Sequence, residues 1–306
     1  MPMLHEMFYW VLSMSIVATL TGGIVWGIRA VKCLPRRAAV MLWVIPFARM
    51  ALPFGINSPF GVMTLLSRVT TNTVTVFQPA EQVALSMTNC IMAADTYFPI
   101  TYKVNRLETV FTVAAAVWLV GTAGLLVWIA VVYRAARREA DTATHLKDNI
   151  YVSDGCSSPY VYGILRPKIV LPASLDGNDR EWVLLHEQTH IRRGDNVWRL
   201  LAVMLTAAHW FNPFSWLFLK RCLADMETAC DEQVLAQSGE DRAKEYARLL
   251  LRFAQPKPNL SSAFGGAPVK ERIGHILSYK TLTRLSVVVS AVLVIVSAFV
   301  LLTNAG

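Results

Sequence analysis

Two histidines four residues apart, with a glutamate directly after the first, form the chemically most specific pattern in this sequence. The segment reads His186-Glu187-Gln188-Thr189-His190. Residues four apart on a helix share one face, so both imidazoles can bind one metal ion while Glu187 projects toward a water bound to that ion. With six His and eleven Glu in 306 residues, chance gives roughly 0.004 matches to this spacing, so coincidence explains it poorly.

A catalytic zinc ion needs a third protein ligand and one open coordination position. The next long helical segment offers Glu227 and Asp231, which are four residues apart and therefore share a face. We expect Glu227 to bind the metal and Asp231 to accept a hydrogen bond from the far nitrogen of a ligand histidine. Cys230 is the alternative third ligand, but a thiolate favours a closed structural site and leaves Glu187 without a hydrolytic role.

This donor set predicts metal-assisted hydrolysis, with Zn²⁺ as the cofactor and Glu187 as the general base. The pattern does not identify the donor that stabilises the oxyanion. His209 is the first candidate, because Asn212-Pro213 can break the apolar run 197–219 and turn His209 toward the site. Further candidates are Tyr160, Tyr162 and Tyr246.

The elements around this motif follow from local signals. A helix begins at Asn178 or Asp179 and ends after Arg193, where Gly194 is a good stop. Before it, the runs 150–153 and 161–171 have the short, β-branched character of strands and are separated by Gly and Pro. We expect 161–171 to form a sheet edge along which an extended peptide substrate binds.

The composition indicates an integral membrane protein. Charged residues make up 16% of the chain, against about 25% in ordinary soluble domains, and 54% of the chain is apolar. These values exclude a disordered tail, a fibrous repeat and a typical cytosolic enzyme. Four stretches are long enough to cross a hydrocarbon core of about 30 Å: residues 7–28, 38–56, 110–133 and 285–302.

Basic residues orient these four predicted transmembrane helices. Arg29, Lys32, Arg36 and Arg37 follow the first stretch without any acid, so this loop is expected inside and both chain termini outside. Three domains follow: residues 1–133 with an extracytoplasmic loop at 57–108, a cytoplasmic domain at 134–283, and the last span within 284–306.

Other features fit this topology. The apolar run 197–219 is interpreted as a hairpin, because a crossing there would separate Glu227 from His190. Arg49 inside the second stretch is expected to be structural. Only Cys90 falls in the outside loop, so no disulfide within the chain is expected there.

The order of these segments resembles the BlaR/MecR family of antirepressor metallopeptidases. The resemblance rests on Leu171-Pro172, on the His186 motif continued to Arg193 and Asp195, on the block 209–213, and on Glu227-x-x-Cys230-Asp231. It implies a gluzincin-like α+β zinc peptidase domain in the cytoplasm, held in the bacterial inner membrane. The implied zinc ligands are His186, His190 and Glu227, with Glu187 as general base.

The resemblance also implies substrates. These are a cytoplasmic repressor and the chain itself, within the segment 259–266, and we place a hypothetical self-cleavage point at Ala263-Phe264. Full-length receptors of the family continue into an extracellular penicillin-binding domain, whereas this sequence stops at Gly306. The expected partners are the lipid bilayer and a cytoplasmic repressor or peptide substrate, with no direct nucleic acid. Whether the chain forms a homo-oligomer stays open.

Two other functions also stay open. The same zinc geometry serves a membrane-protein quality-control protease. A receptor with a purely structural metal is the alternative outside enzymes, and Glu187 argues against it.

Overall fold

The computed structural model describes residues 2–31, 34–52, 57–62, 64, 105–156, 158–175, 177–253, 268–280 and 283–305. The predicted cleavage point at Ala263-Phe264 and most of the predicted outer loop 57–108 lie outside these residues. The helices are α1 Pro2–Arg29, α2 Arg36–Ala51, α5 Asn105–Thr142, α6 Gly177–Arg193, α7 Asp195–Ala208, α8 Pro213–Ser238, α9 Ala243–Phe253, α11 Val269–Leu277 and α12 Arg284–Leu302. The strands are β1 Asn57–Ser58, β2 Thr144–Lys147, β3 Ile150–Ser153, β4 Tyr160–Tyr162, β5 Lys168–Pro172 and β6 Asn304–Ala305.

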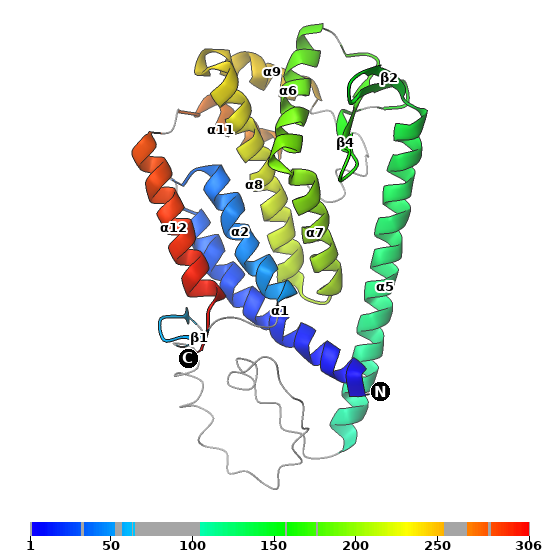
Figure 1. The fold of residues 1–306 in the computed structure, drawn as a ribbon, viewed down its shortest axis with the longest axis vertical. Coiled ribbons are helices and arrows are strands. Elements are labelled where there is room, and N and C mark those ends of the chain that lie inside the picture. The colour runs from blue at the N-terminus through cyan, green and yellow to red at the C-terminus, as the bar shows by residue number, and fades with distance from the viewer. Residues whose placement is uncertain are drawn as a thin grey trace.

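Figure 1 shows two regions that share one long helix. Helices α1, α2, α7, α8 and α12 form a bundle, and α5 runs along one side of it. Helices α6, α9 and α11 and a small mixed sheet lie at one end of this bundle. Helix α8 reaches from the bundle into that end region and therefore belongs to both.

Three helices of the described chain are long and apolar enough to cross a membrane: Glu6–Arg29, Thr109–Thr142 and Arg284–Leu302. They correspond to three of the four predicted stretches. The predicted stretch 38–56 becomes α2, whose 16 residues rise about 24 Å and include Pro46. Four spans are therefore not confirmed. Helix α2 is shorter than the predicted stretch, and it packs against α1, α8 and α12.

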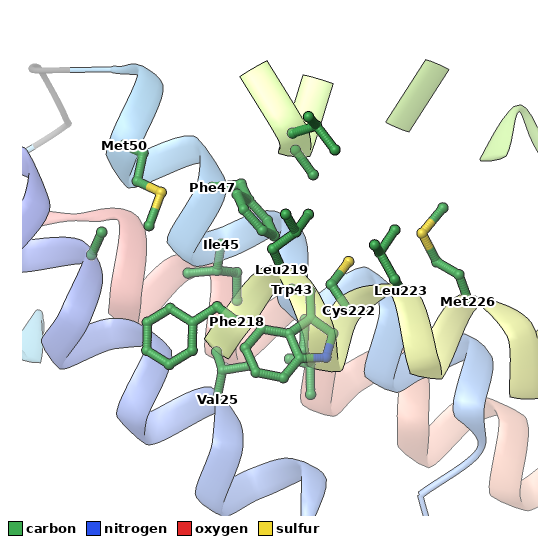
Figure 2. Close-up of a cluster of buried hydrophobic side chains, with 14 of the residues drawn as sticks. Val25, Trp43, Ile45, Phe47, Met50, Phe218, Leu219, Cys222, Leu223 and Met226 are labelled. Atoms are coloured by element: carbon green, nitrogen blue, oxygen red, sulfur yellow. The ribbon is translucent and has the colours of Figure 1, made fainter. Parts of the chain in front are cut away.

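The bundle core forms where α2 and α8 meet (Figure 2). The rings of Trp43 and Phe218 lie 5.6 Å apart between centroids, and both side chains are buried. Helix α1 approaches the same point through Gly22. A Cβ atom on Gly22 would lie 2.2 Å from the Phe218 ring, so only glycine allows this close approach.

Arg49 has a structural role, as predicted. Its buried guanidinium donates hydrogen bonds to the carbonyl oxygens of Leu301 (3.0 Å) and Thr303 (2.7 Å), at the C-terminal end of α12. These are carbonyls that a helix end leaves without partners. Next to them, β1 pairs with β6 in parallel. The ends of α2 and α12 are therefore tied together.

The apolar run 197–219 is a hairpin, as predicted. The Asn212 side chain accepts a hydrogen bond from the Phe214 backbone N–H (2.9 Å), and Pro213 occupies the first helical position. The Asn212 amide also donates to the Ser15 hydroxyl (2.8 Å) on α1. Helix α8 consequently runs back along α7, which returns Glu227 to the level of His190.

The sheet has the strand order β2-β3-β5-β4, with β3 and β5 parallel and the two outer pairs antiparallel. The predicted single strand 161–171 is wrong in extent, because the chain reverses at Gly163 (φ +98°) and divides it into β4 and β5. Of these two strands, β4 lies at an edge of the sheet and β5 in its interior, and β4 packs against α6.

A buried acid joins three helices next to the site region. Asp225 of α8 is 1% exposed and accepts hydrogen bonds from the Arg29 guanidinium at the end of α1. The Trp43 indole N–H of α2 donates to the same carboxylate at 2.8 Å. Because a buried carboxylate needs such partners, this cluster fixes the register of α1, α2 and α8.

We predict that Asp225→Asn lowers the free energy of unfolding by about 3 kcal/mol, because it leaves the Arg29 charge without its partner. The measurement is the unfolding midpoint of the purified protein in detergent. Asp141→Asn is the matched control: Asp141 is 52% exposed and pairs with Lys168 at the surface, so the change should stay within about 0.5 kcal/mol. Equal effects of both variants would contradict the stabilising role of Asp225.

Candidate metal centre

Helix α6 forms where the sequence predicts it and carries both histidines. It spans Gly177–Arg193 and ends in the basic residues Arg192 and Arg193, which suit the negative end of the helix dipole. Gly194 follows with φ +68°, a conformation that glycine adopts without strain, and the chain reverses into α7. The start of α7 is thereby brought back to the end of α6.

The structure brings together the three residues that the sequence predicts as metal ligands. The Nε2 atoms of His186 and His190 lie 3.1 Å apart. One oxygen of Glu227 is 3.6 Å from the Nε2 atom of His186, and the other is 3.7 Å from that of His190. All three side chains are at most 14% exposed. The donors therefore face one common point between α6 and α8.

The far nitrogen of His190 is held by Asp195. Its Nδ1 atom lies 2.7 Å from Asp195 Oδ2, and the Asp195 carboxylate also lies 3.4 Å from the Arg193 guanidinium. Asp195 is buried at the first turn of α7. A carboxylate on Nδ1 keeps the proton there and leaves Nε2 free as a ligand. The sequence motif included Asp195, but no role was predicted for it.

The far nitrogen of His186 reaches an acid through a tyrosine. Its Nδ1 atom is 2.8 Å from the Tyr246 hydroxyl, which donates to Asp231 Oδ1 at 2.6 Å. The direct Nδ1 to Asp231 distance is 3.5 Å, so the predicted direct bond is relayed by Tyr246. Because this hydroxyl gives its proton to Asp231, it accepts the Nδ1 proton of His186 and fixes that tautomer.

Two arginines contact Glu227, and sequence analysis predicted neither contact. Arg199 of α7 approaches Glu227 Oε1 at 2.9 Å, and Arg272 of α11 approaches Oε2 at 3.3 Å. Arg272 also makes a two-bonded pair with Asp231, at 2.8 and 2.7 Å. No local signal marks these arginines, because α7 and α11 meet α8 only in the folded chain.

The charges of the site shift the pKa values of its donors. Burial lowers the pKa of His186, but Cys230 and Glu227 outweigh burial and raise it to about 10. Burial raises the pKa of Glu227, but His190, His186 and Arg272 hold it well below its usual range. The donors together therefore favour a positive charge between them, which a divalent cation supplies.

Cys230 lies close to both imidazoles. Its Sγ atom is 3.5 Å from His186 Nδ1 and donates to the His186 carbonyl oxygen at 3.4 Å. His186, His190 and Cys230 have donor atoms within 4.8 Å of one another, so this group could also hold a metal ion. The two Nε2 atoms, however, face the Glu227 carboxylate.

The residues present fit a tetrahedral zinc ion. Zinc–nitrogen bonds of about 2.0–2.1 Å at tetrahedral angles separate two ligand atoms by about 3.3 Å. The three donor separations, at 3.1, 3.6 and 3.7 Å, lie around that value. Both imidazoles already have their Nδ1 atoms engaged, which is the usual condition of ligand histidines.

The two residues predicted as catalytic lie in different places. Glu187 is partly exposed on α6, directly after His186. His209 is not brought to the site: its Nε2 atom contacts the Met50 carbonyl oxygen at 3.1 Å, at the opposite end of α7 from Asp195. Helix α7 has 14 residues and is therefore about 21 Å long, which separates His209 from the metal ligands.

Part of this sequence is similar to that of known proteins. Regulatory protein BlaR1 of Bacillus licheniformis is 29% identical over 134 residues, which cover 40% of this chain and 22% of the relative. Methicillin resistance mecR1 protein of Staphylococcus aureus is 25% identical over 146 residues, or 44% of this chain and 25% of the relative. The protein of that name from Staphylococcus epidermidis matches equally. The matched region thus spans about a quarter of each relative.

A family profile extends the similarity over most of the chain. The profile described as BlaR1 peptidase M56 matches residues 9–276, which include most of α1, all of α2 and α5, and every described residue of the candidate metal centre. This chain therefore belongs to the BlaR1 peptidase M56 family.

Proposed function

We propose that this chain is a membrane-bound zinc endopeptidase that cleaves a cytoplasmic protein as a step in signal transduction. The observation that carries the proposal is the convergence of His186, His190 and Glu227, each within 3.7 Å of another donor, beside Glu187. Membership of a peptidase family supports hydrolysis of peptide bonds.

The ligands in this proposal are His186, His190 and Glu227. A bound Zn²⁺ would polarise the scissile carbonyl and acidify the attacking water. Glu187 takes a proton from that water as its oxygen attacks the carbonyl carbon, and it delivers the proton to the nitrogen when the C–N bond breaks. Asp195 and Tyr246 hold the two imidazoles in the required tautomers throughout.

The edge strand β4 offers a place for the substrate. It pairs with β5 on one side, and the described residues place no strand on its other side. An extended peptide can add to such an edge through backbone hydrogen bonds, which demand little of its sequence. Because β4 packs against α6, a peptide bound there would run past the metal ligands.

The basic residues support a cytoplasmic site. Arg29 ends α1, Arg134 to Arg138 follow the apolar part of α5, and Arg284 begins α12. All three lie at the bundle end that carries α6 and the sheet (Figure 1). By the positive-inside rule, this end faces the cytoplasm.

The relatives and the chain path suggest the substrates. The name of one relative contains the words "regulatory protein", and the names of others contain "methicillin resistance". These names support a regulatory role, which we propose is the cleavage of a cytoplasmic repressor. Self-cleavage near Ala263-Phe264 is part of the proposal. The segment that holds this point joins α9, which carries Tyr246, to α11, which carries Arg272, and both residues lie at the site.

We predict that Glu187→Gln keeps about one Zn²⁺ per chain but slows peptide cleavage by a factor of about 10² to 10⁴, because only the general base is lost. The full chain in liposomes is incubated with a proteome-derived peptide mixture, and products and the intact chain mass are read by mass spectrometry. The matched control is Glu181→Gln on the exposed side of α6, which should cleave normally.

Three outcomes separate the parts of this proposal. Zinc-bound wild type that cuts no peptide and not itself would indicate a receptor with a structural metal. Identical intact masses for wild type and Glu187→Gln would remove self-cleavage alone. Wild type without bound zinc would remove the metal assignment.

We predict that Glu227→Gln weakens Zn²⁺ binding more than about 100-fold, whereas Cys230→Ala changes it less than about tenfold. The reason is that Glu227 faces both Nε2 atoms while Cys230 contacts His186 from its Nδ1 side. The measurement is competition with a zinc chelator. The reverse order of the two effects would assign the third ligand to Cys230.

We predict that Zn²⁺ binding at about pH 7 releases between about one and two protons. The raised pKa values of His186 and His190 keep protons on these imidazoles in the metal-free site, and the metal must displace them. Affinity therefore falls with acidification and rises with pH up to the raised pKa values. Titration calorimetry in buffers of different ionisation enthalpy counts the protons, and zero release would contradict the charge state derived above.

A further inference from the structure

The two arginines that contact Glu227 differ in what else they bind. Arg272 is 13% exposed, and its Nε and one terminal nitrogen are bonded to Asp231. Arg199 is 44% exposed, and it donates a hydrogen bond to Glu227 Oε1 at 2.9 Å. A guanidinium has five N–H donors, so Arg199 keeps donors that face solvent beside the metal ligands.

The first two turns of α7 place Arg199 between three parts of the site. Asp195 holds His190, and Arg199 lies four residues later on the same helix face. Between them, the Asn196 amide donates to the Gly163 carbonyl oxygen at 3.1 Å. Gly163 directly follows the edge strand β4. Arg199 therefore lies where a peptide bound along β4 would reach Glu227.

Two of the donors predicted from sequence for the oxyanion, His209 and Tyr246, are engaged in other hydrogen bonds. His209 contacts the Met50 carbonyl oxygen at the far end of α7. The Tyr246 hydroxyl donates to Asp231 and accepts from His186. Hydrolysis still places negative charge on the carbonyl oxygen, and a preorganised donor at that position is a large source of rate. A guanidinium can donate hydrogen bonds there without transferring a proton.

We propose that Arg199 is a catalytic residue that binds the carbonyl oxygen of the scissile peptide bond and stabilises its developing negative charge. The inference rests on the proposed function, which supplies the reaction. As water attacks the carbonyl carbon, the carbonyl electron pair moves to the oxygen that Arg199 contacts. Glu187 carries the proton to the leaving amine, and Arg199 keeps all its protons throughout.

A positioning role through Glu227 is the competing reading of the same contact. If Arg199 only oriented the Glu227 carboxylate, its loss would weaken metal binding, and catalysis would follow the metal. If Arg199 contacts the substrate oxygen, metal binding stays intact and kcat falls. Metal affinity and kcat, measured on the same variants, therefore separate the two roles.

The first test uses the full chain in liposomes and a peptide that the wild type cleaves in the mixture described above. We expect Arg199→Ala to keep its zinc affinity within about threefold and to lose about 10² to 10³ in kcat, with a smaller change in KM. Arg199→Lys should recover part of the loss, because it restores the charge without the planar fork. Arg192→Ala is the control, since Arg192 is exposed on α6 and bonds to Gln237.

The second test measures binding without turnover. One probe is N-phosphoryl-Leu-Trp, whose tetrahedral phosphoryl group imitates the charge distribution of the reacting carbonyl. The other is a dipeptide hydroxamate, a metal chelator without that tetrahedral anion. We expect Arg199→Ala to weaken binding of the phosphoryl probe by about the factor by which kcat/KM falls, about 10² or more. Binding of the hydroxamate should weaken by less than about threefold.

The outcomes are distinguishable. Equal losses for both probes together with zinc loss would make Arg199 a positioning residue and overturn the inference. Unchanged kcat and probe binding in Arg199→Ala would overturn it as well. If zinc-loaded wild type cleaves no peptide and binds neither probe, the proposed function itself is contradicted, and the inference about Arg199 is contradicted with it.

Discussion

The centre of this structure depends on holding two imidazole nitrogens and a carboxylate against one another in a buried place. The Nε2 atoms of His186 and His190 lie 3.1 Å apart, and Glu227 faces both. Such donors would turn away from each other if their far sides were free. Asp195 and the Tyr246–Asp231 pair hold those far sides, so the Nε2 atoms stay directed at one point. A cation bound at that point would attract all three donors and so offset the repulsion between them.

Helix α8 supplies the negative charges on which the arrangement relies. Asp225, Glu227, Asp231 and Glu232 all lie on it, and each meets a partner from a different part of the chain. These partners are Arg29 of α1, Arg199 of α7, Arg272 of α11 and the backbone N–H of Arg36 at the start of α2. Buried carboxylates are costly without partners, so the pairing selects this packing over other apolar arrangements.

The sequence predicted the parts of the site that depend on helix period alone. The four-residue spacing on a helix was enough to predict His186, Glu187 and His190. An acid on the next long helix was enough to predict Glu227. Asp195 and Tyr246 could not be assigned, because their contacts depend on the reversal at Gly194 and on a tertiary contact 60 residues away. His209 does lie at the break in the apolar run, but the 14 residues of α7 place it about 21 Å from Asp195 and so away from the site.

The same limit applies to the fold. An apolar stretch looks alike whether it faces lipid or other helices, so the sequence could not show that the apolar side chains of α2 fill the bundle core. The run 161–171 was predicted as one strand, because the reversal at Gly163 into two antiparallel strands depends on pairing that local sequence does not encode.

The geometry of α8 has a mechanical consequence. Its 26 residues form one helix about 39 Å long, which begins in the bundle core around Phe218 and ends in the second core around Val234. Glu227 lies between these two anchored ends, two residues after Asp225. Because Asp225 is bonded to Arg29 and Trp43, α1 and α2 cannot shift along α8 without breaking a buried charge pair or carrying Glu227 with them. The helix bundle and the candidate metal centre are therefore joined through α8, so a displacement of α1 or α2 along α8 would act on the segment that carries Glu227.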